Sequence, residues 1–366
     1  MRIALIELRR RPGRFAPAGI ALVLLTLLLL VLGGLLDGLY NGSSGALRAQ
    51  PGDLVTYSSD AKLSLVRSRI DRATVAEVEN VPGVEAAGGL GTALLGAEVP
   101  DHRDEVSVAL FGYQLAPRGV PSPPTQTGDV YADRSLEAYG VKGGQTLLLG
   151  PAKYPVVVVG WVSDTNFLLQ GGLWGSLDTW RAALASARPD AVLSPGTVQA
   201  LTVSTASGAD PSRVASAIDD ATGGATQTVT RTKAVASLPG LEQQRTTFNS
   251  IIYTTFFVAA LVVSLFFALL TLERIGMYAV FKAVGASSRQ IFTQVLLQAI
   301  VIAVISLIAG GLLALGASFV IPPQVPIQLT AGRAVEVAVG LIIMSTIGSA
   351  LSLRRVVRID PASAIG

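Results

Sequence analysis

The sequence predicts a membrane α-helical protein with four transmembrane helices and a large extracytoplasmic α+β domain between spans one and two. Half of the 366 residues are hydrophobic and only 14% are charged, a composition typical of an integral membrane protein with a sizeable soluble part. Four uncharged apolar runs are long enough to cross a bilayer as helices. Residues 41–245, between the first two runs, alternate strand-like and helix-like patterns.

The first span is predicted at residues 15–40. A cytoplasmic amino tail, residues 1–14, carries five arginines and precedes the uncharged run from Phe15 to Leu36. The 22 residues of this run extend about 33 Å as a helix. A signal peptide has the same order of charged and apolar residues, but its apolar part is shorter and ends at a small-residue cleavage site. We therefore interpret the run as a retained span.

Residues 41–245 are expected to form the extracytoplasmic domain. Strands are predicted where apolar runs are bounded by glycine and proline. Three helices are predicted where segments begin at Asp or Pro, and a fourth where a short segment ends at Val-Pro-Gly. The predicted strands are Val106–Phe111, Thr146–Leu149, Val156–Val162, Ala200–Thr205 and Thr226–Thr230. The predicted helices are Ala73–Asn80, Asp133–Tyr139, Asp178–Ala187 and Pro211–Ala221. The stretch Ala116–Gly128, with four prolines, predicts a loop.

The later spans are predicted at residues 246–272, 291–321 and 337–353, with an external loop at 322–336 and a cytoplasmic tail at 354–366. Four spans place both termini on the same side of the membrane. Eleven of the 12 basic residues outside the domain lie in the amino tail, the middle loop and the carboxyl tail. The positive-inside rule places these segments in the cytoplasm. We expect a multi-pass protein of the cell (plasma) membrane with both termini cytoplasmic.

The charged interruption between spans two and three, residues 273–290, predicts a short amphipathic helix on the cytoplasmic side. Such a helix is suited to receive force from a soluble partner. We expect its charged side chains to contact that partner and its small residues to let the chain turn into span three; the residues concerned are Glu273, Arg274, Lys282, Gly285 and Ala286. The alternative is an ordinary connecting loop.

The sequence lacks the usual marks of an enzyme. It has no G-x-x-x-x-G-K-[ST] phosphate loop, no nucleophile elbow and no metal-spaced His/Glu cluster. There is no cysteine, and the single histidine, His102, is expected in a solvent-facing loop. We predict no catalytic residue. Nucleic-acid binding is not expected either, because residues 41–245 hold 16 basic and 20 acidic residues, so the excess of positive charge lies in the membrane part.

One polar stripe is a candidate binding surface. Glu242, Arg245, Asn249 and Tyr253 are spaced three, four and four, which puts them within about 80° of one another on a helix. They are expected to line the external half of span two, where Tyr40 and Asp37 join them from the end of span one. The alternative is an interfacial belt, in which Glu242 and Arg245 form an ion pair and the tyrosine lies at the membrane surface.

Two motifs resemble the permease subunits of FtsX/MacB-type (type VII) ABC transporters. These are Phe281-Lys-Ala-Val-Gly-Ala between spans two and three, and Leu353-Arg-Arg-Val-Val-Arg-Ile-Asp-Pro-Ala in the tail. The segment Gly143–Val162 is also similar to that family. The resemblance implies a permease without catalytic activity of its own, paired with a second copy of itself and with two copies of a cytoplasmic ABC ATPase that holds ATP and Mg. It also implies that spans one and two form the dimer seam within membrane lipid.

A narrower resemblance is to haem-exporter permeases of the HrtB type. It rests on Gly34-Leu-Leu-Asp-Gly-Leu, Ser318-Phe-Val-Ile-Pro-Pro and Ile347-Gly-Ser-Ala-Leu-Ser. It implies efflux of haem or a similar amphiphile from the membrane, with Arg245 for the carboxylates and Tyr253 or Glu242 as ligand of the haem iron. Tyrosines implicated in haem handling by some members fall at Phe167 and Leu241 here.

Two other functions stay open at this point. One is an FtsX-like signalling permease, which transmits the motion of the ATPase to an external cell-wall hydrolase. The other is an exporter of a lipid or glycolipid.

Overall fold

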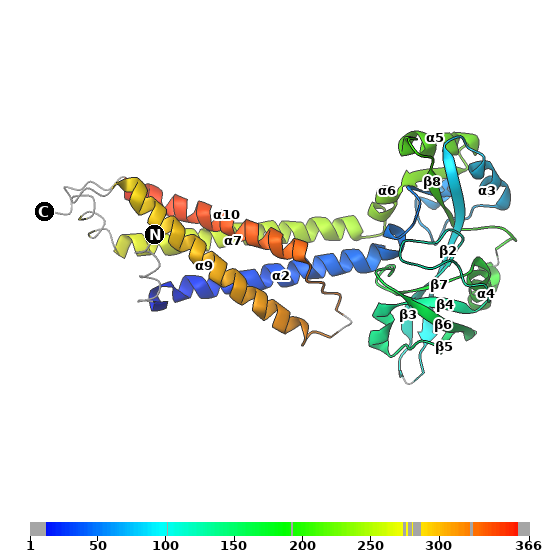
Figure 1. Cartoon of the computed structure of the whole chain (residues 1–366), viewed down its shortest axis with the longest axis horizontal. Coiled ribbons are helices and arrows are strands. Elements are labelled where there is room, and N and C mark those ends of the chain that lie inside the picture. The colour runs from blue at the N-terminus through cyan, green and yellow to red at the C-terminus, as the bar shows by residue number, and fades with distance from the viewer. Residues whose placement is uncertain are drawn as a thin grey trace. The chain divides into compact units, whose positions relative to one another are not determined.

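The computed structural model describes residues 12–100, 102–191, 193–273, 276, 280, 287–322 and 325–357. The chain divides into two compact units. The helical unit comprises the residues up to Gly38 and those from Gln244, and the sheet-rich unit comprises Leu39–Gln243. Figure 1 shows the four long helices and the sheet-rich unit inserted between the first and second of them. The predicted fold class is confirmed.

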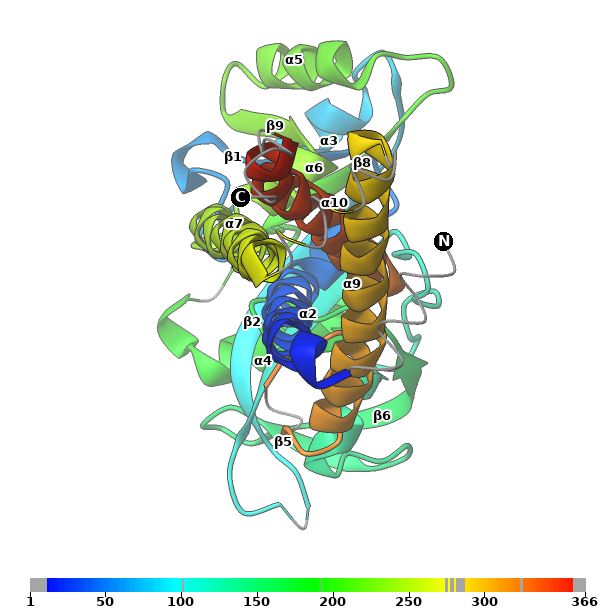
Figure 2. The same cartoon turned by 90° about the vertical axis from the view of Figure 1, so that its left-hand side faces the viewer.

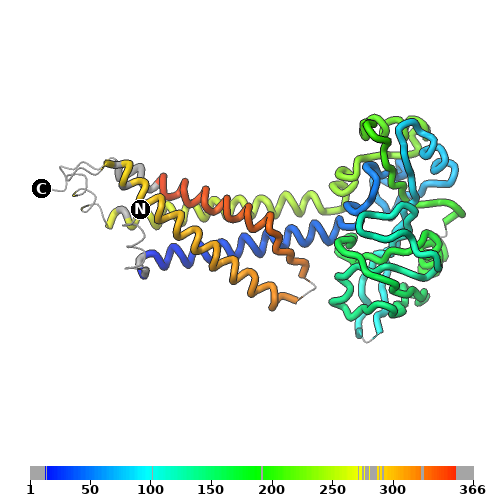
Figure 3. Tube along the Cα trace, viewed as in Figure 1, coloured from blue at the N-terminus to red at the C-terminus, as the bar shows by residue number. Residues whose placement is uncertain are grey.

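The long helices are α2 (Pro12–Arg48), α7 (Leu241–Glu273), α9 (Ser288–Ser318) and α10 (Ala331–Val357). Each contains a segment long and apolar enough to cross a membrane, by length and composition: Phe15–Arg48, Leu241–Leu270, Phe292–Ser318 and Ala331–Leu351. Because α10 begins at Ala331, it includes Arg333 and Glu336, which were expected in the loop before it. Figure 3 follows the chain through this unit, from the blue α2 to the red α10.

In the helical unit, α2 is in contact with each of the other three helices. Figure 2, which looks along the helices, shows α7, α9 and α10 on different sides of α2. Two apolar clusters join all four helices: one includes Leu22, Val263, Ile302 and Leu341, and the other includes Leu29, Phe256, Ala314 and Val337. Small residues permit close contact. A Cβ at Gly310 of α9 would lie only 2.7 Å from the Cβ of Thr26 on α2.

One lobe of the sheet-rich unit has a split β-α-β arrangement. Its elements are β1 (Leu54–Ser58), η1 (Ser59–Ala61), α3 (Arg72–Glu79), β2 (Val84–Glu98), β8 (Ala200–Thr205), α5 (Pro211–Ala221), β9 (Thr226–Thr230) and α6 (Arg231–Ala236). The strands pair antiparallel in the order β2-β8-β1-β9. Val78 of α3 and Ile218 of α5 are fully buried against Leu54, Leu201 and Val203 of this sheet.

The second lobe is inserted between β2 and β8. It contains β3 (Val106–Tyr113), β4 (Asp129–Asp133), η2 (Arg134–Tyr139), β5 (Thr146–Leu149), β6 (Tyr154–Val162), β7 (Gly171–Gly175), α4 (Leu177–Ala187) and η3 (Pro189–Ala191). Because the far half of β2 pairs with both β3 and β5, the strands β2, β3, β7, β4, β6 and β5 close on themselves as a barrel. The long strand β2 therefore belongs to both lobes.

All five predicted strands and the four predicted helices are present, with ends within two residues of those expected. Asp133–Tyr139 forms the 3-10 helix η2, for which the Asp133 side chain is the N-cap. Four strands were not predicted: β1, β2, β4 and β7. Two of them, β2 and β7, are rich in glycine, which weakens the strand pattern but allows close packing. A Cβ at Gly91 of β2 would overlap the indole of the fully buried Trp180.

A loop of the barrel lobe, residues 164–170, holds the last turns of α2 within the sheet-rich unit. Leu168 and Leu169 donate backbone hydrogen bonds to the carbonyls of Ser43 and Gly42, at 3.1 and 3.0 Å, and Ala46 donates to the carbonyl of Asn166 at 3.0 Å. Asp164, Leu168 and Leu169 all have positive φ, at 57°, 51° and 65°. Such a backbone persists only where its surroundings determine it.

The buried carboxylate of Asp133 provides one such constraint on this loop. It accepts hydrogen bonds from both the backbone and the hydroxyl of Thr165, at 2.8 and 2.7 Å. Its other oxygen accepts from the backbone of Ser135 at 2.9 Å. The last turns of α2 are therefore hydrogen-bonded to a loop that is itself held by the buried carboxylate of Asp133.

The contact between Gly91 and Trp180 yields a stability prediction. Gly91→Ala is expected to lower the stability of the sheet-rich unit by about 1–3 kcal/mol, because the new methyl group forces the buried indole to move. The matched control is Gly143→Ala, where the nearest atom to a new Cβ is 3.6 Å away; it is expected to change stability by less than about 0.5 kcal/mol. Thermal unfolding of the full chain, followed by tryptophan fluorescence, measures both. Equal midpoints for the two variants would contradict this account of β2.

Candidate functional site

The four residues of the predicted polar stripe lie on α7. Glu242, Arg245 and Tyr253 are exposed, and Asn249 is half-buried. Hydroxyl groups extend this surface, since Thr246, Ser250 and Thr254 are also exposed. The Ser250 and Thr254 hydroxyls donate to backbone carbonyls one turn earlier, at 2.8 Å in each case. Their lone pairs remain able to accept from a ligand.

The exposed face of α7 changes character after Thr254. The exposed residues that follow are large and apolar: Phe257, Val258, Leu261, Leu265 and Leu269. Tyr253, which is 64% exposed, stands next to this boundary. The face thus offers polar groups at one end and an apolar stripe along the rest, the pattern that an amphiphile needs.

Tyr40 belongs to the sheet-rich unit, where its ring lies under the Arg48 guanidinium with the charge 5.6 Å from the ring centre. This is a cation–π contact between residues about two turns apart on α2. Arg48 is fixed further by donating from Nε to the Ser44 hydroxyl at 3.1 Å. The ring also packs against the main apolar core of that unit. Tyr40 therefore has a structural role in its own unit, and its expected part in a binding surface stays a prediction.

A polar cluster that the sequence did not predict joins α2 to the start of α10. We call Asp37, Thr330, Arg333 and Glu336 the α2–α10 cluster. Arg333 donates from Nη2 to Asp37 Oδ1 at 2.6 Å and from Nε to Asp37 Oδ2 at 3.4 Å. Its Nη1 donates to Glu336 at 2.6 Å. The Thr330 hydroxyl donates to Asp37 at 2.9 Å and accepts from the backbone of Arg333 at 3.2 Å.

Glycines on α2 create the space for this cluster. A Cβ at Gly33 would overlap the stem of Arg333, and a Cβ at Gly38 would overlap the carbonyl of Pro326. Between them, Gly34 accepts a hydrogen bond from the backbone of Gln328 at 2.9 Å. The chain that links α9 to α10 therefore lies directly on the backbone of α2, and it carries Thr330 and Arg333 to Asp37.

The cluster lies about one bilayer thickness from the charges at the other ends of its helices. Asp37 is 23 residues from Arg14, and Arg333 is 21 residues from Arg354, which correspond to about 35 and 32 Å of helix. Tyr253 is 20 residues from Glu273, or about 30 Å. Arg245 and Glu242 lie farther along α7, two to three turns beyond Tyr253.

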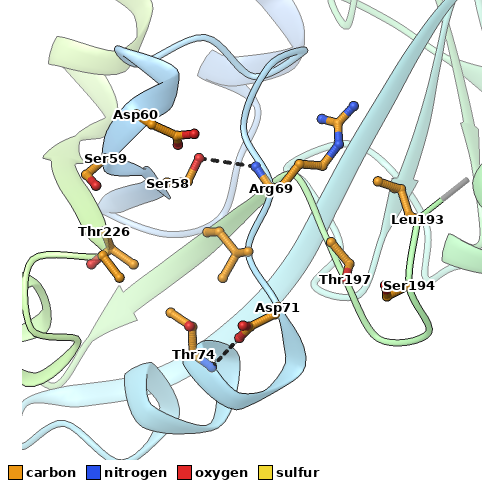
Figure 4. Close-up of a pocket in the computed structure, with 12 residues that line it drawn as sticks. Ser58, Ser59, Asp60, Arg69, Asp71, Thr74, Leu193, Ser194, Thr197 and Thr226 are labelled. Carbon is orange, nitrogen blue, oxygen red and sulfur yellow. Dashed lines mark hydrogen bonds between the residues drawn. The ribbon is translucent and has the colours of Figure 1, made fainter. Parts of the chain in front are cut away.

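The sheet-rich unit has a separate open cavity of about 630 Å³, bordered by β1, α3 and the chain before β8 (Figure 4). Its lining is mostly polar: Ser58, Ser59, Asp60, Arg69, Asp71, Thr74, Ser194, Thr197 and Thr226. Several of these groups already serve the fold. Asp71 caps α3 by accepting from the Thr74 backbone, which lowers the pKa of its carboxyl group. Arg69 donates to the carbonyls of Val66 and Ser68; burial and then the charge of Arg188 lower its pKa.

Metal-ligand side chains are not gathered anywhere in the described part of the chain: no group of three or more His, Cys, Asp or Glu residues lies within reach of one ion there. His102 makes an edge contact with Tyr139, with ring centres 6.1 Å apart. Phe167 and Leu241 are buried in the core of the sheet-rich unit.

Comparison with known protein families identifies part of the helical unit. Residues 249–361 match the family model described as FtsX-like permease C-terminal. These residues form an FtsX-like permease domain. The permease domain contains most of α7, the whole of α9 and α10, and three members of the α2–α10 cluster.

Named relatives agree with this assignment. A stretch of 141 residues is 38% identical to an uncharacterized ABC transporter permease of Mycobacterium tuberculosis and covers 38% of this chain and 40% of that protein. A stretch of 140 residues is 26% identical to a protein of Staphylococcus epidermidis described as a hemin transport system permease, HrtB, again covering 38% and 40%. The chain thus spans about two-fifths of the length of these relatives.

Among solved structures, the periplasmic region of MacB from Actinobacillus actinomycetemcomitans aligns with 51% of this chain and 92% of its own, at 11% identity and a TM-score of 0.37. The resemblance to FtsX/MacB-type permeases that the sequence motifs indicated is confirmed through the permease domain, and the four apolar helices make this a multi-pass membrane protein.

The predicted coupling segment falls largely outside the described residues of the permease domain. Glu273 is exposed at the end of α7, whereas Arg274, Lys282, Gly285 and Ala286 lie outside the described residues. The described end of the segment begins α9, where Ser287 and Gln290 form a reciprocal capping box. The role of these residues stays a prediction.

The ion pair of Asp37 and Arg333 is expected to show strong coupling in a double-mutant cycle. Arg333→Gln alone leaves the Asp37 carboxylate uncompensated in surroundings where its side chain is only 20% exposed. The double variant Asp37→Asn/Arg333→Gln is therefore expected to be no less stable than Arg333→Gln alone. The coupling energy between the two residues is expected to be about 1.5–3 kcal/mol.

The Arg134–Glu137 pair, with side chains 60% and 47% exposed, is the control and should couple by less than about 1 kcal/mol. Unfolding of the full chain in one detergent provides both values. Additive effects at residues 37 and 333 would show that the pair does not stabilise the helical unit.

Proposed function

We propose that this chain is the permease subunit of an ABC-type efflux pump that exports haem or a similar amphiphile from the membrane. The observation that carries the proposal is the FtsX-like permease domain at residues 249–361. Relatives named as ABC transporter permeases and as HrtB support it. In this proposal the chain works as a homodimer with two copies of a separate ATPase.

The energy source is expected to lie in the partner. The sequence contains no G-x-x-x-x-G-K-[ST] phosphate loop, so ATP and Mg would be bound by the ATPase subunit. The permease itself would then need no cofactor and no catalytic residue. Its task is mechanical: residues 273–290 receive the motion of the ATPase, and the helices change their packing around the cargo.

The distribution of charge supports an orientation with both termini and the coupling segment in the cytoplasm. Five arginines lie within residues 1–14, before or at the start of α2, and Arg274, Lys282 and Arg289 lie between the end of α7 and the first turn of α9. Basic residues near the ends of membrane helices favour the cytoplasmic side. The sheet-rich unit would then be outside the cell membrane, and no nucleic acid would be a partner.

The exposed face of α7 supports an amphiphilic cargo. Hydroxyl and charged groups inside or near a membrane span are costly when they face lipid. The polar end of the face, from Arg245 to Thr254, would therefore be covered by a second copy of the chain or by cargo, and the apolar end would contact lipid or the hydrophobic part of the cargo. Haem has both parts, since a flat apolar ring carries two propionate groups.

Haem binding is the direct test of the cargo. The purified full chain is expected to bind ferric haem in a saturable way with a shifted Soret band, and haem should stimulate ATP hydrolysis by the complex with the ATPase. Tyr253→Phe or Glu242→Gln should alter the band if that oxygen ligates iron, whereas Arg245→Ala should weaken binding about tenfold or less without changing the band.

Tyr139→Phe, in the sheet-rich unit, is the control and should leave the band unchanged. Absence of both binding and stimulation would exclude haem and leave a lipid or glycolipid as cargo. A strain lacking the chain separates export from signalling, because haem hypersensitivity fits export and cell chaining fits control of a cell-wall hydrolase.

The coupling segment yields a further prediction. Gly285→Val is expected to lower ATP turnover of the complex several-fold while the sheet-rich unit stays folded, because a β-branched residue disfavours the turn into span three that the sequence predicts at this residue. Gly316→Ala is the matched control, since a Cβ there meets no atom within 4 Å. Turnover of the co-purified complex and circular dichroism of the same samples are the measurements. Normal turnover in several Gly285 variants would make the segment an ordinary connection.

A further inference from the structure

The α2–α10 cluster contains two carboxylates, Asp37 and Glu336, and one cation, Arg333. Arg333 carries one positive charge, whereas Asp37 and Glu336 carry one negative charge each, and both contact it at 2.6 Å. The two contacts differ in kind. Asp37 holds Arg333 through two nitrogens and is 20% exposed, whereas Glu336 takes one nitrogen and is 49% exposed.

Arg333 is held in one position by several independent contacts. Gly33 leaves room for its stem, Asp37 binds the Nε and Nη2 edge of the fork, and Thr330 links its backbone to the same carboxylate. A planar guanidinium fixed in this way presents its remaining nitrogen, Nη1, in a constant direction. Nη1 donates its hydrogen bond to the Glu336 carboxylate.

Glu336 is the group that is easily displaced from Arg333. It lies three residues further along the same helix, its side chain is 49% exposed, and it binds one nitrogen of Arg333, whereas Asp37 binds two. An incoming anion that replaced Glu336 would keep the number of charges around Arg333 unchanged. The guanidinium, which is only 12% exposed, would at no stage be left with an uncompensated charge.

We infer that Arg333 binds the acidic group of an anionic amphiphile at Nη1, that Glu336 occupies this place when no cargo is bound, and that Asp37 is a positioning residue that keeps the guanidinium in place. The inference rests on the proposed function and adds that the cargo carries a carboxylate. The phenol of Tyr253 on α7 is 64% exposed.

The inference predicts the sign of the effect of Glu336→Gln. Removal of the competing carboxylate should tighten the binding of an acidic amphiphile, whereas a purely structural role for Glu336 predicts equal or weaker binding. Arg333→Gln should abolish the preference for the acidic amphiphile over an analogue that lacks the acid. Arg333→Lys should reduce it, because lysine keeps the charge but cannot hold Asp37 with two nitrogens of a fork.

The experiment compares haemin with its dimethyl ester, which has the same ring without the two acids. Both are titrated against the full chain in nanodiscs of zwitterionic phosphatidylcholine, so that no anionic lipid competes. We expect the wild type to bind haemin about tenfold more tightly than the ester, the equivalent of one charge-assisted hydrogen bond. Glu336→Gln should increase this ratio about three- to tenfold, and Asp37→Asn should decrease it.

Glu137→Gln is the matched control, because Arg134 and Glu137 form an ion pair with the same spacing on the exposed helix η2. It should leave the ratio unchanged. Discs that contain phosphatidylglycerol identify the source of the anion: loss of haemin preference there, with ester binding unchanged, would mean that a lipid phosphate takes the same guanidinium.

The outcomes separate the inference from the proposed function. If both ligands bind the wild type but Glu336→Gln and Arg333→Gln leave the ratio at the wild-type value, the inference is wrong and the haem proposal survives. If Arg333→Gln does not fold, Glu336→Gln alone decides, since it removes only an exposed contact. If neither ligand binds the wild type in a saturable way, the haem proposal and the inference that rests on it both fail.

Discussion

Small residues along α2 allow the rest of the helical unit to approach its backbone closely. At one end, Ser306 of α9 donates its hydroxyl to the carbonyl of Gly19 at 3.2 Å. In the middle, Gly310 faces Thr26. Towards Asp37, Gly34 and Gly38 receive the chain that links α9 to α10. Helices in lipid gain little from hydrophobic burial against one another, so such close contacts and the hydrogen bonds that they permit determine how the helices pack.

The sequence was sufficient for the parts of the fold that depend on local pattern. Hydrophobic length alone locates four membrane helices, and β-branched runs locate strands such as β6 and β8. The sequence was insufficient where tertiary contacts determine the secondary structure. The strand β2 reads as a run of alanine and glycine, and it becomes a strand because Gly91 and Gly112 let two neighbouring backbones pack against Trp180. No window of the sequence around β2 contains that information.

The candidate site shows the same division. The spacing of Arg245, Asn249 and Tyr253 is a helical property, so the stripe on α7 could be predicted from the sequence alone. Asp37 and Arg333 are 296 residues apart, and Arg333 appeared to be a loop charge because three prolines precede it. A signal was nevertheless available. An acid at the end of one span and a base at the start of another, each about one bilayer thickness from the opposite end of its helix, are natural partners.

The exposed faces of α7 and α9 differ in a way that bears on their surroundings. On α9 the exposed residues are apolar for several turns, including Ile305, Ile308, Leu312 and Leu315, as lipid contact requires. On α7 the continuous apolar stripe begins at Phe257, and most of the exposed residues before it, from Arg245 to Thr254, are polar, with Ile251 as the apolar exception. Hydroxyl groups on a helix that is surrounded by lipid alone can bond only to the backbone of that helix, so they bring no further contact there. The exposed hydroxyls of α7 therefore favour surroundings other than lipid alone. The polar end of α7 and the Nη1 edge of Arg333 are therefore two places among the described residues of the helical unit where contact with a polar group would replace a contact that the protein now makes with itself.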